Sequence, residues 1–133
     1  MTHKKAEHKN KNLSPDTEQI IFNGGTERPF TGEYDKHFEE GLYYCINCSQ
    51  PLFSSGTKYN SGSGWPSFWQ AYQEDAVAKE KDTSLGMIRT EVQCSNCGAH
   101  LGHLFEDGPK PTGLRYCINS KALDFELEKT KGE

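Results

Sequence analysis

After Gly41 the chain places its hydrophobic residues in short runs that are separated by Gly, Pro and Ser. The runs are rich in Tyr, Phe, Ile and Val, which favour β-strands. They read "LYYCINC", "PLFSS", "KYN", "GMIRTEVQC", "HLGHLF", "LRYCINS" and "LDFELE". Short strand-like runs between turn residues are typical of an all-β domain. The pattern therefore predicts a mainly β fold.

The segment before these runs has a different pattern, and it predicts one helix. Ser14 is a good N-cap residue and Pro15 suits the first helical position. The string "NGG" from Asn23 supplies the residues that end helices. The stretch "ERPFTGEYDKHFEEG" reads as a loop with room for one helical turn. Within the strand-like region, "PSFWQAYQE" after Trp65 is a second, short helical candidate.

The length of 133 residues favours one domain. Residues 1–12 are polar and aperiodic, and we expect them to be a disordered tail. The predicted domain covers residues 13–127, and residues 128–133 are expected to fray. The hydrophobic fraction of 33% is modest, so a cross-link or a bound metal would help to stabilise the core.

Charge and hydropathy narrow the possible partners and the compartment. The formal net charge is −4, which weighs against a nucleic-acid-binding protein. No apolar run approaches the length of a membrane span, and the N-terminus has no secretory signal pattern. An odd count of five cysteines does not fit a disulfide framework. We therefore expect a cytoplasmic protein with reduced thiols, and nothing in the sequence calls for more than a monomer.

Four of the five cysteines form two Cys-x2-Cys pairs, Cys45 with Cys48 and Cys94 with Cys97. Each pair places two thiolates on one tight turn, and two such turns supply the tetrahedral sulfur set of a structural zinc site. The pairs are separated by 45 residues, so one zinc per chain would join two distant segments. A site with four protein ligands is closed and does no chemistry itself.

Two other readings of these cysteines stay open. One pair could be a redox-active dithiol, although that motif expects a βαβ context. The string "CSNCGAHLGH" also offers Cys94, Cys97, His100 and His103 at a spacing that suits a Cys2His2 metal site. That second reading would leave the first cysteine pair unexplained.

Cys117 belongs to neither pair and is the candidate nucleophile. If "LRYCINS" is a strand, Arg115, Cys117 and Asn119 share one face, while the apolar Tyr116 and Ile118 face inward. A nearby guanidinium favours the thiolate form of cysteine, which is the nucleophilic form. The alternative is that Cys117 is a small buried hydrophobic residue.

The histidines in "HLGHLFEDG" favour the catalytic interpretation of Cys117. If the four paired cysteines hold the metal, His100 and His103 are left over, with Asp107 close by in the sequence. One Cys, two His and the Asn at position 119 make a set suited to nucleophilic and acid–base chemistry. Taken singly, each His would more simply be a surface or hydrogen-bonding residue.

Trp65 is the candidate for binding an apolar group. It lies between Gly64 and Pro66, which places it in a loop rather than in a regular strand. There it could offer a flat aromatic wall to a small apolar or sulfur-bearing group. The alternative is an ordinary core tryptophan.

Several of these motifs, in this order, resemble the zinc-containing B-type methionine sulfoxide reductases. The motifs are "GTERPFTGEY", the first Cys-x2-Cys, "SGSGWPSF", "CSNCGAHLGHLFEDGPKPTG" and "RYCINS". The resemblance extends from about Leu13 to about Phe125. It implies two antiparallel β-sheets with short N-terminal helices, and zinc held by the four paired cysteines away from the active site. It also implies reduction of the R epimer of methionine sulfoxide, free or in oxidised proteins.

The resemblance implies a role for each candidate residue. Cys117 attacks the sulfoxide sulfur and becomes a sulfenic acid when methionine leaves. His103, with His100 and Asp107 near it, supplies the proton that the departing oxygen needs. The remaining roles are hydrogen bonding and charge around the thiolate for Asn119 and Arg115, and contact with the substrate methyl group for Trp65 and Phe105.

One residue departs from the pattern of many family members, which carry a resolving cysteine where this chain has Ser63. A serine hydroxyl cannot form a disulfide with the sulfenic acid, and the other cysteines are assigned to zinc. We therefore expect thioredoxin or another external thiol to reduce Cys117 directly.

A non-catalytic, zinc-stabilised protein-binding module is the alternative function, because fold alone does not fix function. A pure binding module has no need to bring Cys117, His100, His103, Asn119 and Trp65 together, so their arrangement discriminates between the two.

Overall fold

The helix predicted near the N-terminus is present in the computed structural model, which describes residues 9–83 and 86–127. Helix α1 runs from Pro15 to Asn23, and the Ser14 hydroxyl accepts a hydrogen bond from the Thr17 amide at 3.1 Å. It ends at Gly24, whose left-handed φ of 74° lets its amide return to carbonyls of the last turn. The family resemblance implied short helices in the plural, and α1 is the one α-helix within the described residues.

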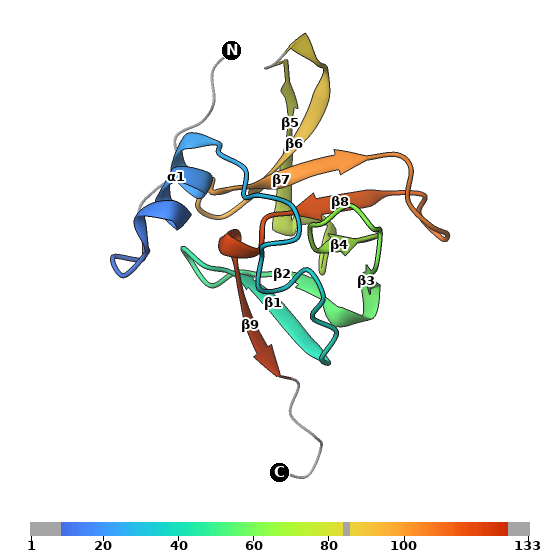
Figure 1. Cartoon of the computed structure of the whole chain (residues 1–133), viewed down its shortest axis with the longest axis horizontal. Coiled ribbons are helices and arrows are strands. Elements are labelled where there is room, and N and C mark those ends of the chain that lie inside the picture. The colour runs from blue at the N-terminus through green and yellow to red at the C-terminus, as the bar shows by residue number, and fades with distance from the viewer. Residues whose placement is uncertain (1–8, 84–85, 128–133) are drawn as a thin grey trace.

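Nine strands of the described residues form two antiparallel sheets, which confirms the predicted mainly β fold (Figure 1). The smaller sheet has the order β2 (Pro51–Ser54), β1 (Gly41–Cys45), β9 (Leu123–Leu127). The larger sheet has the order β3 (Lys58–Tyr59), β4 (Ser67–Phe68), β8 (Arg115–Ile118), β7 (His100–Phe105), β6 (Arg89–Cys94), β5 (Val77–Asp82). Short 3-10 turns precede three strands: η1 (Ser55–Thr57), η2 (Glu74–Ala76) and η4 (Ser120–Ala122).

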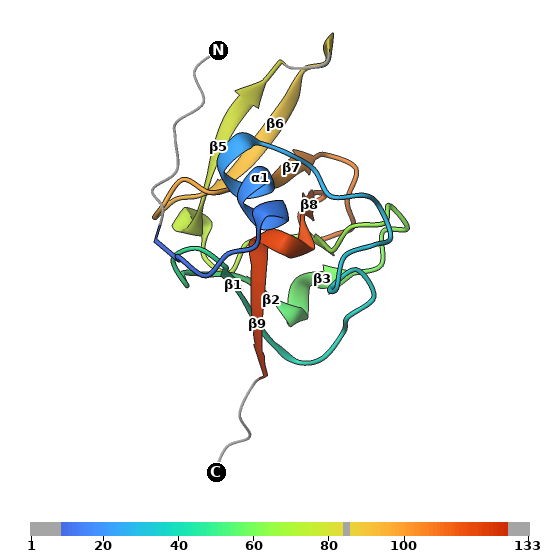
Figure 2. The same ribbon diagram turned by 60° about the vertical axis from the view of Figure 1, so that its left-hand side comes forward.

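The core lies between the two sheets and contains a cluster of aromatic side chains. Phe53 of β2 stacks on Phe68 of β4, with ring centroids 4.4 Å apart, and also contacts Tyr116 of β8. Tyr43 of β1 meets Phe68 edge-on. Helix α1 contacts β7 and η4 and buries Ile21 completely (Figure 2). Both sheets therefore contribute to one hydrophobic core.

The second helical candidate, residues 66–74, is wrong. Ser67 and Phe68 form β4, and the backbone amides that follow bond to other segments instead of to the preceding turn. The Trp69 amide donates to the Thr57 carbonyl at 3.0 Å, and the Tyr72 amide donates to the Leu52 carbonyl at 2.7 Å. Hydrogen bonds to other segments thus outweigh the weak helical propensity of this stretch.

Strand β5 was not among the predicted strands. Only Val77 is buried along it, because β5 is an edge strand and most of its other residues are exposed. The β5–β6 hairpin extends from the body of the molecule, upward in the view of Figure 1. No helix in residues 9–83 and 86–127 is long and apolar enough to cross a bilayer.

The predicted domain limits at residues 12 and 127 stay predictions. Residues 1–8 and 128–133 lie outside the described part of the chain. Near the predicted start of the domain, the amides of Lys9 and Asn10 donate to the Asn47 side-chain oxygen, at 2.9 and 3.0 Å. Residues 9 and 10 are thereby attached to the turn between Cys45 and Cys48.

Candidate active site and metal centre

The four paired cysteines converge on one point where the two sheets meet. Cys45 ends β1 and Cys94 ends β6, and the second cysteine of each pair lies in the turn that follows. The ligand atoms all lie within 4.8 Å of one another, with sulfur–sulfur distances of 3.7 Å for Cys45–Cys97 and 3.5 Å for Cys48–Cys94. Sulfurs bound to a tetrahedral metal at about 2.3 Å lie about 3.8 Å apart, so the cysteines fit one metal ion.

The two cysteine turns have the same backbone conformation. The amide of Ser49 donates to the Cys45 carbonyl at 2.8 Å, and the amide of Gly98 donates to the Cys94 carbonyl at 2.8 Å. Ser49 and Gly98 both adopt left-handed φ angles, of 70° and 84°. Equivalent turns point their sulfurs at a shared centre, which is the geometry that a four-thiolate site requires.

The structure does not support the two other readings of the cysteines. All four thiols belong to one cluster, which leaves no separate dithiol in a βαβ unit. Within the described residues the four cysteines are also the only His, Cys, Asp and Glu group close enough to hold a metal, so the Cys2His2 interpretation is wrong. His100 and His103 bond to carboxylates instead, as described below.

Cys117 lies in the middle of the larger sheet, on β8, which is one of its two central strands. Its register partners are His103 on β7 and Ser67 on β4. The side chains of β8 alternate as predicted, with Tyr116 and Ile118 buried in the core and Arg115 and Cys117 partly exposed. The fold therefore brings the candidate nucleophile and a histidine side by side from segments 14 residues apart.

A cavity of about 270 Å³ opens beside Cys117. Seven residues singled out from the sequence line it, and three others join them. The lining residues are Thr26, Ser63, Trp65, Arg89, Gly102, His103, Phe105, Arg115, Cys117 and Asn119. His100 and Asp107 are absent from this lining. The volume suits a small side chain rather than a large cofactor.

Burial raises the pKa of the Cys117 thiol above its ordinary value. A proton donated by the Ser63 hydroxyl, whose oxygen lies 3.8 Å from the sulfur, and the Arg115 guanidinium would both lower that pKa, but they do not reverse the effect of burial. The sequence predicts a thiolate from the nearby Arg115 alone, without the effect of burial. Burial leaves the resting thiol more protonated than the guanidinium alone would.

His103 is hydrogen-bonded to a carboxylate that the sequence did not identify. Its Nε2 lies 2.7 Å from Oδ2 of Asp82, on β5, and the same oxygen accepts from Arg89 at 3.3 Å. Burial lowers the pKa of His103, while the hydrogen bond to Asp82 acts in the opposite direction. The Asp82 contact fixes the imidazole through one ring nitrogen and leaves the other on the far side of the ring.

His100 is buried, contacts His103 and does not itself line the cavity. Its Nδ1 is 2.6 Å from Oε2 of Glu91 on β6, and its ring meets His103 edge-on at a centroid distance of 5.6 Å. This position suits a residue that packs against His103 more than one that touches a ligand in the cavity.

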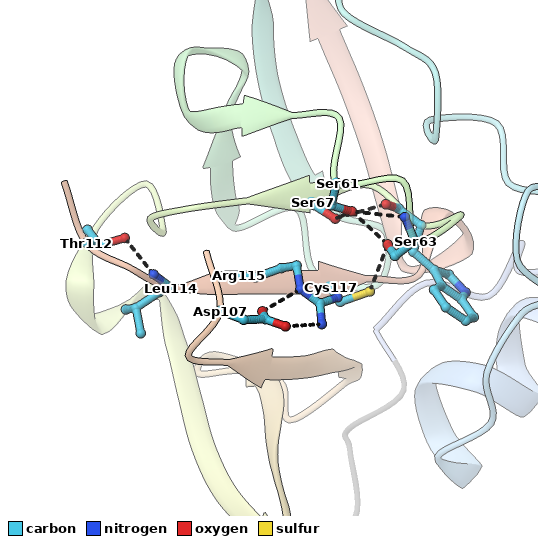
Figure 3. A network of polar contacts seen from close by, with 9 residues as sticks. Ser61, Ser63, Ser67, Asp107, Thr112, Leu114, Arg115 and Cys117 are labelled. Carbon is cyan, nitrogen blue, oxygen red and sulfur yellow. Dashed lines mark hydrogen bonds and ion pairs between the residues drawn. The ribbon is translucent and has the colours of Figure 1, made fainter. Parts of the chain in front are cut away.

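Arg115 is held at the rim of the cavity by Asp107 and Phe105. Asp107 accepts two hydrogen bonds from the guanidinium, at 2.8 and 3.2 Å (Figure 3). The guanidinium also lies 4.3 Å from the centre of the Phe105 ring. The pKa of Asp107 is lowered by the hydrogen bond from Arg115. The structure thus places Asp107 against Arg115, whereas the sequence grouped it with His103.

Asn119 and Trp65 are both fixed by the loop that contains Glu27. The Asn119 amide donates to the Leu101 carbonyl at 3.0 Å and accepts from the Glu27 backbone amide at 3.0 Å. The Trp65 indole donates to the Glu27 carbonyl, also at 3.0 Å. One loop residue therefore holds both the Asn119 amide and the Trp65 indole, and both side chains line the cavity.

Gly102 shows why β7 and β8 come so close at the site. A Cβ built on Gly102 would overlap the Cys117 carbonyl oxygen, so any side chain there would push the two strands apart. The glycine between the two histidines was visible in the sequence, but the strand that it approaches was not.

A partly exposed thiol beside a carboxylate-bound histidine, in a small cavity with an aromatic wall, defines a class of enzyme that uses cysteine as its nucleophile. Comparison with known proteins identifies the family. The SelR domain matches residues 13–127. The peptide methionine sulfoxide reductase MsrB of Saccharophagus degradans is 56% identical over 128 residues, covering 96% of each chain. That of Thioalkalivibrio sulfidiphilus is 59% identical over 113 residues, covering 85% of this chain and 82% of its own.

The chain belongs to the MsrB family of peptide methionine sulfoxide reductases, and it is an oxidoreductase. The family resemblance identified from the sequence motifs is thereby confirmed. The enzymatic interpretation is likewise confirmed over the non-catalytic binding module.

Proposed function

We propose that the chain reduces the R epimer of methionine sulfoxide to methionine and that Cys117 is its nucleophile. The observation that carries this proposal is the pairing of Cys117 with His103 across β7 and β8, at the cavity that Trp65 also lines. Family membership supports the reaction, because the relatives are named peptide methionine sulfoxide reductases.

The substrate would enter with its methyl group against the aromatic side of the cavity. Trp65 and Phe105 both line the cavity, and the indole is fixed by its hydrogen bond to Glu27. Sulfur and methyl groups pack favourably on aromatic rings. Free methionine sulfoxide and methionine sulfoxide in oxidised proteins would both present this group.

The chemical step transfers one oxygen atom from the substrate to Cys117. The Cys117 sulfur attacks the sulfoxide sulfur, the sulfur–oxygen bond of the substrate breaks, and the oxygen ends on Cys117 as a sulfenic acid. Methionine gains two electrons and Cys117 loses two. Starting from the protonated thiol, the step needs no net proton, but a proton must move to the oxygen during the attack.

His103 would deliver that proton, with Asp82 as its positioning residue. The Asp82 carboxylate accepts from Nε2, so the protonated ring keeps an Nδ1–H for the substrate side. His100 would support the ring by packing, and Asp107 would act through Arg115, which bears on the charge around Cys117. Asn119 would fix the loop of Glu27, whose carbonyl holds the Trp65 indole.

We expect Asp82→Asn to lower kcat by about tenfold, because an amide binds the imidazolium less strongly than a carboxylate does. Reaction needs protonated His103, so the rate falls as pH rises through the pKa of His103. The Asp82 hydrogen bond raises that pKa, and losing it moves the fall to lower pH. The measurement is a pH profile of kcat. Asp75→Asn, at an exposed aspartate of η2, is the matched control. An unchanged profile in Asp82→Asn would contradict the assignment.

The metal site would hold one structural zinc per chain. Zinc favours four thiolates in a tetrahedron, and this site joins the end of β1 to the end of β6. When bound, zinc supplies a cross-link between the two sheets and takes no part in the chemistry at Cys117. Cysteines that bind zinc must stay reduced, which requires a reducing compartment, and we place the protein in the cytoplasm.

Regeneration of Cys117 would depend on a thiol from outside the chain, such as thioredoxin. Ser63 lies 3.8 Å from the Cys117 sulfur, the position from which a cysteine could resolve the sulfenic acid. An external thiol would form a mixed disulfide with Cys117 and release water, and a second thiol would then release the free Cys117.

We expect the unmodified chain to lose one thiol per turnover and to form no intramolecular disulfide at Cys117. Ser63→Cys is expected to lose two thiols and to form that disulfide, because a sulfur at this position needs to move by only about 2 Å to reach bonding distance. Mass spectrometry without reductant measures both. Recovery of a Cys117 disulfide from the unmodified chain, with zinc still bound, would overturn the external-thiol proposal.

The proposed reaction is tested with separated epimers of a methionine sulfoxide peptide and excess dithiothreitol. We expect the R epimer to be converted to methionine and the S epimer to remain. Conversion of the S epimer at a similar rate would overturn the assigned stereochemistry.

A further inference from the structure

Three serine hydroxyls form a chain that ends at the Cys117 thiol (Figure 3). The Ser63 oxygen lies 3.8 Å from the Cys117 sulfur and 2.8 Å from the Ser61 oxygen. The Ser61 oxygen lies 2.7 Å from that of Ser67, which donates to the Trp65 backbone carbonyl at 3.1 Å. The catalytic proposal above gives no role to Ser61 or Ser67.

The far end of this chain determines the direction of every hydrogen bond in it. A carbonyl only accepts, and each hydroxyl has a single proton to donate. Because the Ser67 proton goes to the Trp65 carbonyl, the Ser61 proton goes to Ser67 and the Ser63 proton goes to Ser61. The Ser61 oxygen also accepts from the Ser63 backbone amide at 3.3 Å, which occupies its second lone pair.

Ser63 therefore presents lone pairs, and not its proton, to the sulfur of Cys117. An acceptor at this position stabilises the S–H form of cysteine, whereas a thiolate needs a donor. Reversing the chain requires all three hydroxyls to rotate and removes the donor from the Trp65 carbonyl. That rotation is costly because Ser67 is completely buried.

We propose that Ser61 and Ser67 are positioning residues that keep the Cys117 thiol protonated in the resting enzyme by fixing Ser63 as a hydrogen-bond acceptor. The hydroxyl chain acts together with the other groups around the thiol. The titratable and charged groups nearest to it are Arg115 on β8, His103 on β7, Tyr59 on β3, Arg89 on β6 and Asp107 in the loop after β7. Ser63 can lower the pKa of Cys117 only if its proton turns to the sulfur, which the chain opposes.

A protonated resting thiol would suit a chain without a resolving cysteine. Peroxides oxidise the thiolate far faster than the thiol, and oxidation beyond the sulfenic acid is irreversible for most proteins. Cys117 is the one cysteine outside the metal cluster, and Ser63 cannot rescue it by forming a disulfide. This benefit rests on the proposed function, whereas the protonation state itself does not.

The test is the pH dependence of Cys117 alkylation in the metal-loaded protein. Iodoacetamide reacts with the thiolate, and mass spectrometry of the Cys117 peptide gives the rate. We expect Ser61→Ala to lower the apparent pKa of Cys117 by about one unit, because Ser63 can then donate to the sulfur. At a pH below this pKa, that shift gives about tenfold more thiolate. Ser67→Ala is expected to shift the pKa in the same direction, and Ser63→Ala is not expected to raise it.

Ser55→Ala is the matched control, since this serine accepts from the Gly41 amide at 3.0 Å in another part of the fold. Its Cys117 alkylation profile should be unchanged. A raised pKa of Cys117 in Ser63→Ala would show that Ser63 donates to the thiolate, and that result would overturn the proposal. An unchanged or raised pKa in a folded Ser61→Ala would overturn it as well. Alkylation needs no turnover, so failure of the reductase proposal would appear separately, as an absence of methionine.

Discussion

Replacing Cys117 with serine is expected to lower the turnover of methionine sulfoxide by at least about 10³-fold, because the sulfur is the group that accepts the oxygen. A serine hydroxyl has nearly the same shape but cannot be oxidised in this way. The backbone carbonyl of Cys117 lies against Gly102, and Cys117 pairs with His103 across β7 and β8. The substitution leaves both backbone contacts unchanged. Methionine release in the presence of dithiothreitol measures the effect.

The Cys117→Ser protein should fold and bind metal as the unmodified chain does. Cys117 is not part of the metal cluster, so metal content and melting temperature are the controls. If this variant retained more than about a tenth of the activity with an intact fold, the nucleophile would have to be another group.

Replacing Cys45 with serine is expected to cause a large loss of stability, whereas Cys117→Ser is expected to keep its fold. Cys45 is buried and would contribute one of four metal ligands, and metal binding to such a site is coupled to folding. We expect the free energy of unfolding to fall by at least about 3 kcal/mol. For a domain of this size, that lowers the melting temperature by about 10 °C. Thermal unfolding and elemental analysis for zinc measure the two changes.

Removal of the metal from the unmodified chain should reproduce the effect of Cys45→Ser. A strong chelator present during heating is expected to lower the melting temperature, and added zinc is expected to restore it. A Cys45→Ser protein with unchanged melting temperature, or one with full zinc content, would contradict a structural four-cysteine site.

The hydrophobic runs predicted most of the strands, but not the exposed edge strand β5 or the two-residue strand β4. "LRYCINS" became β8 and "HLGHLF" became β7, since both bury apolar side chains. Strand β5 escaped prediction because its residues after Val77 are mostly charged and exposed. Strand β4 was mistaken for part of a helix, because two residues are too few to show a strand period.

Which site residues could be found from the sequence also depended on whether each had a local sequence signal. Cys117, His103 and Trp65 carry distinctive chemistry in recognisable strings, and the structure brings all three to one cavity. Asp82 lies on the unpredicted strand and is 21 residues from His103 in the sequence. Glu27 fixes Asn119 through its backbone amide from 92 residues away. Neither contact has a local sequence signal, because both depend on how distant segments pack.

Asp107 shows how sequence proximity misleads in a strand-rich fold. Asp107 is four residues from His103, and the sequence therefore placed the two together. In the structure β7 ends at Phe105, and the chain turns so that Asp107 meets Arg115 on the neighbouring strand. The carboxylate next to His103 comes from β5 instead.

The most direct test of the account is a single turnover without reductant. Fully reduced, zinc-loaded protein is mixed with an excess of racemic methionine sulfoxide, and methionine, the remaining epimer and the free thiols are measured. The account predicts about one methionine per chain, the loss of one thiol at Cys117, and an untouched S epimer. No methionine from the folded, zinc-loaded protein, or loss of thiols from the metal cluster in place of Cys117, would contradict it.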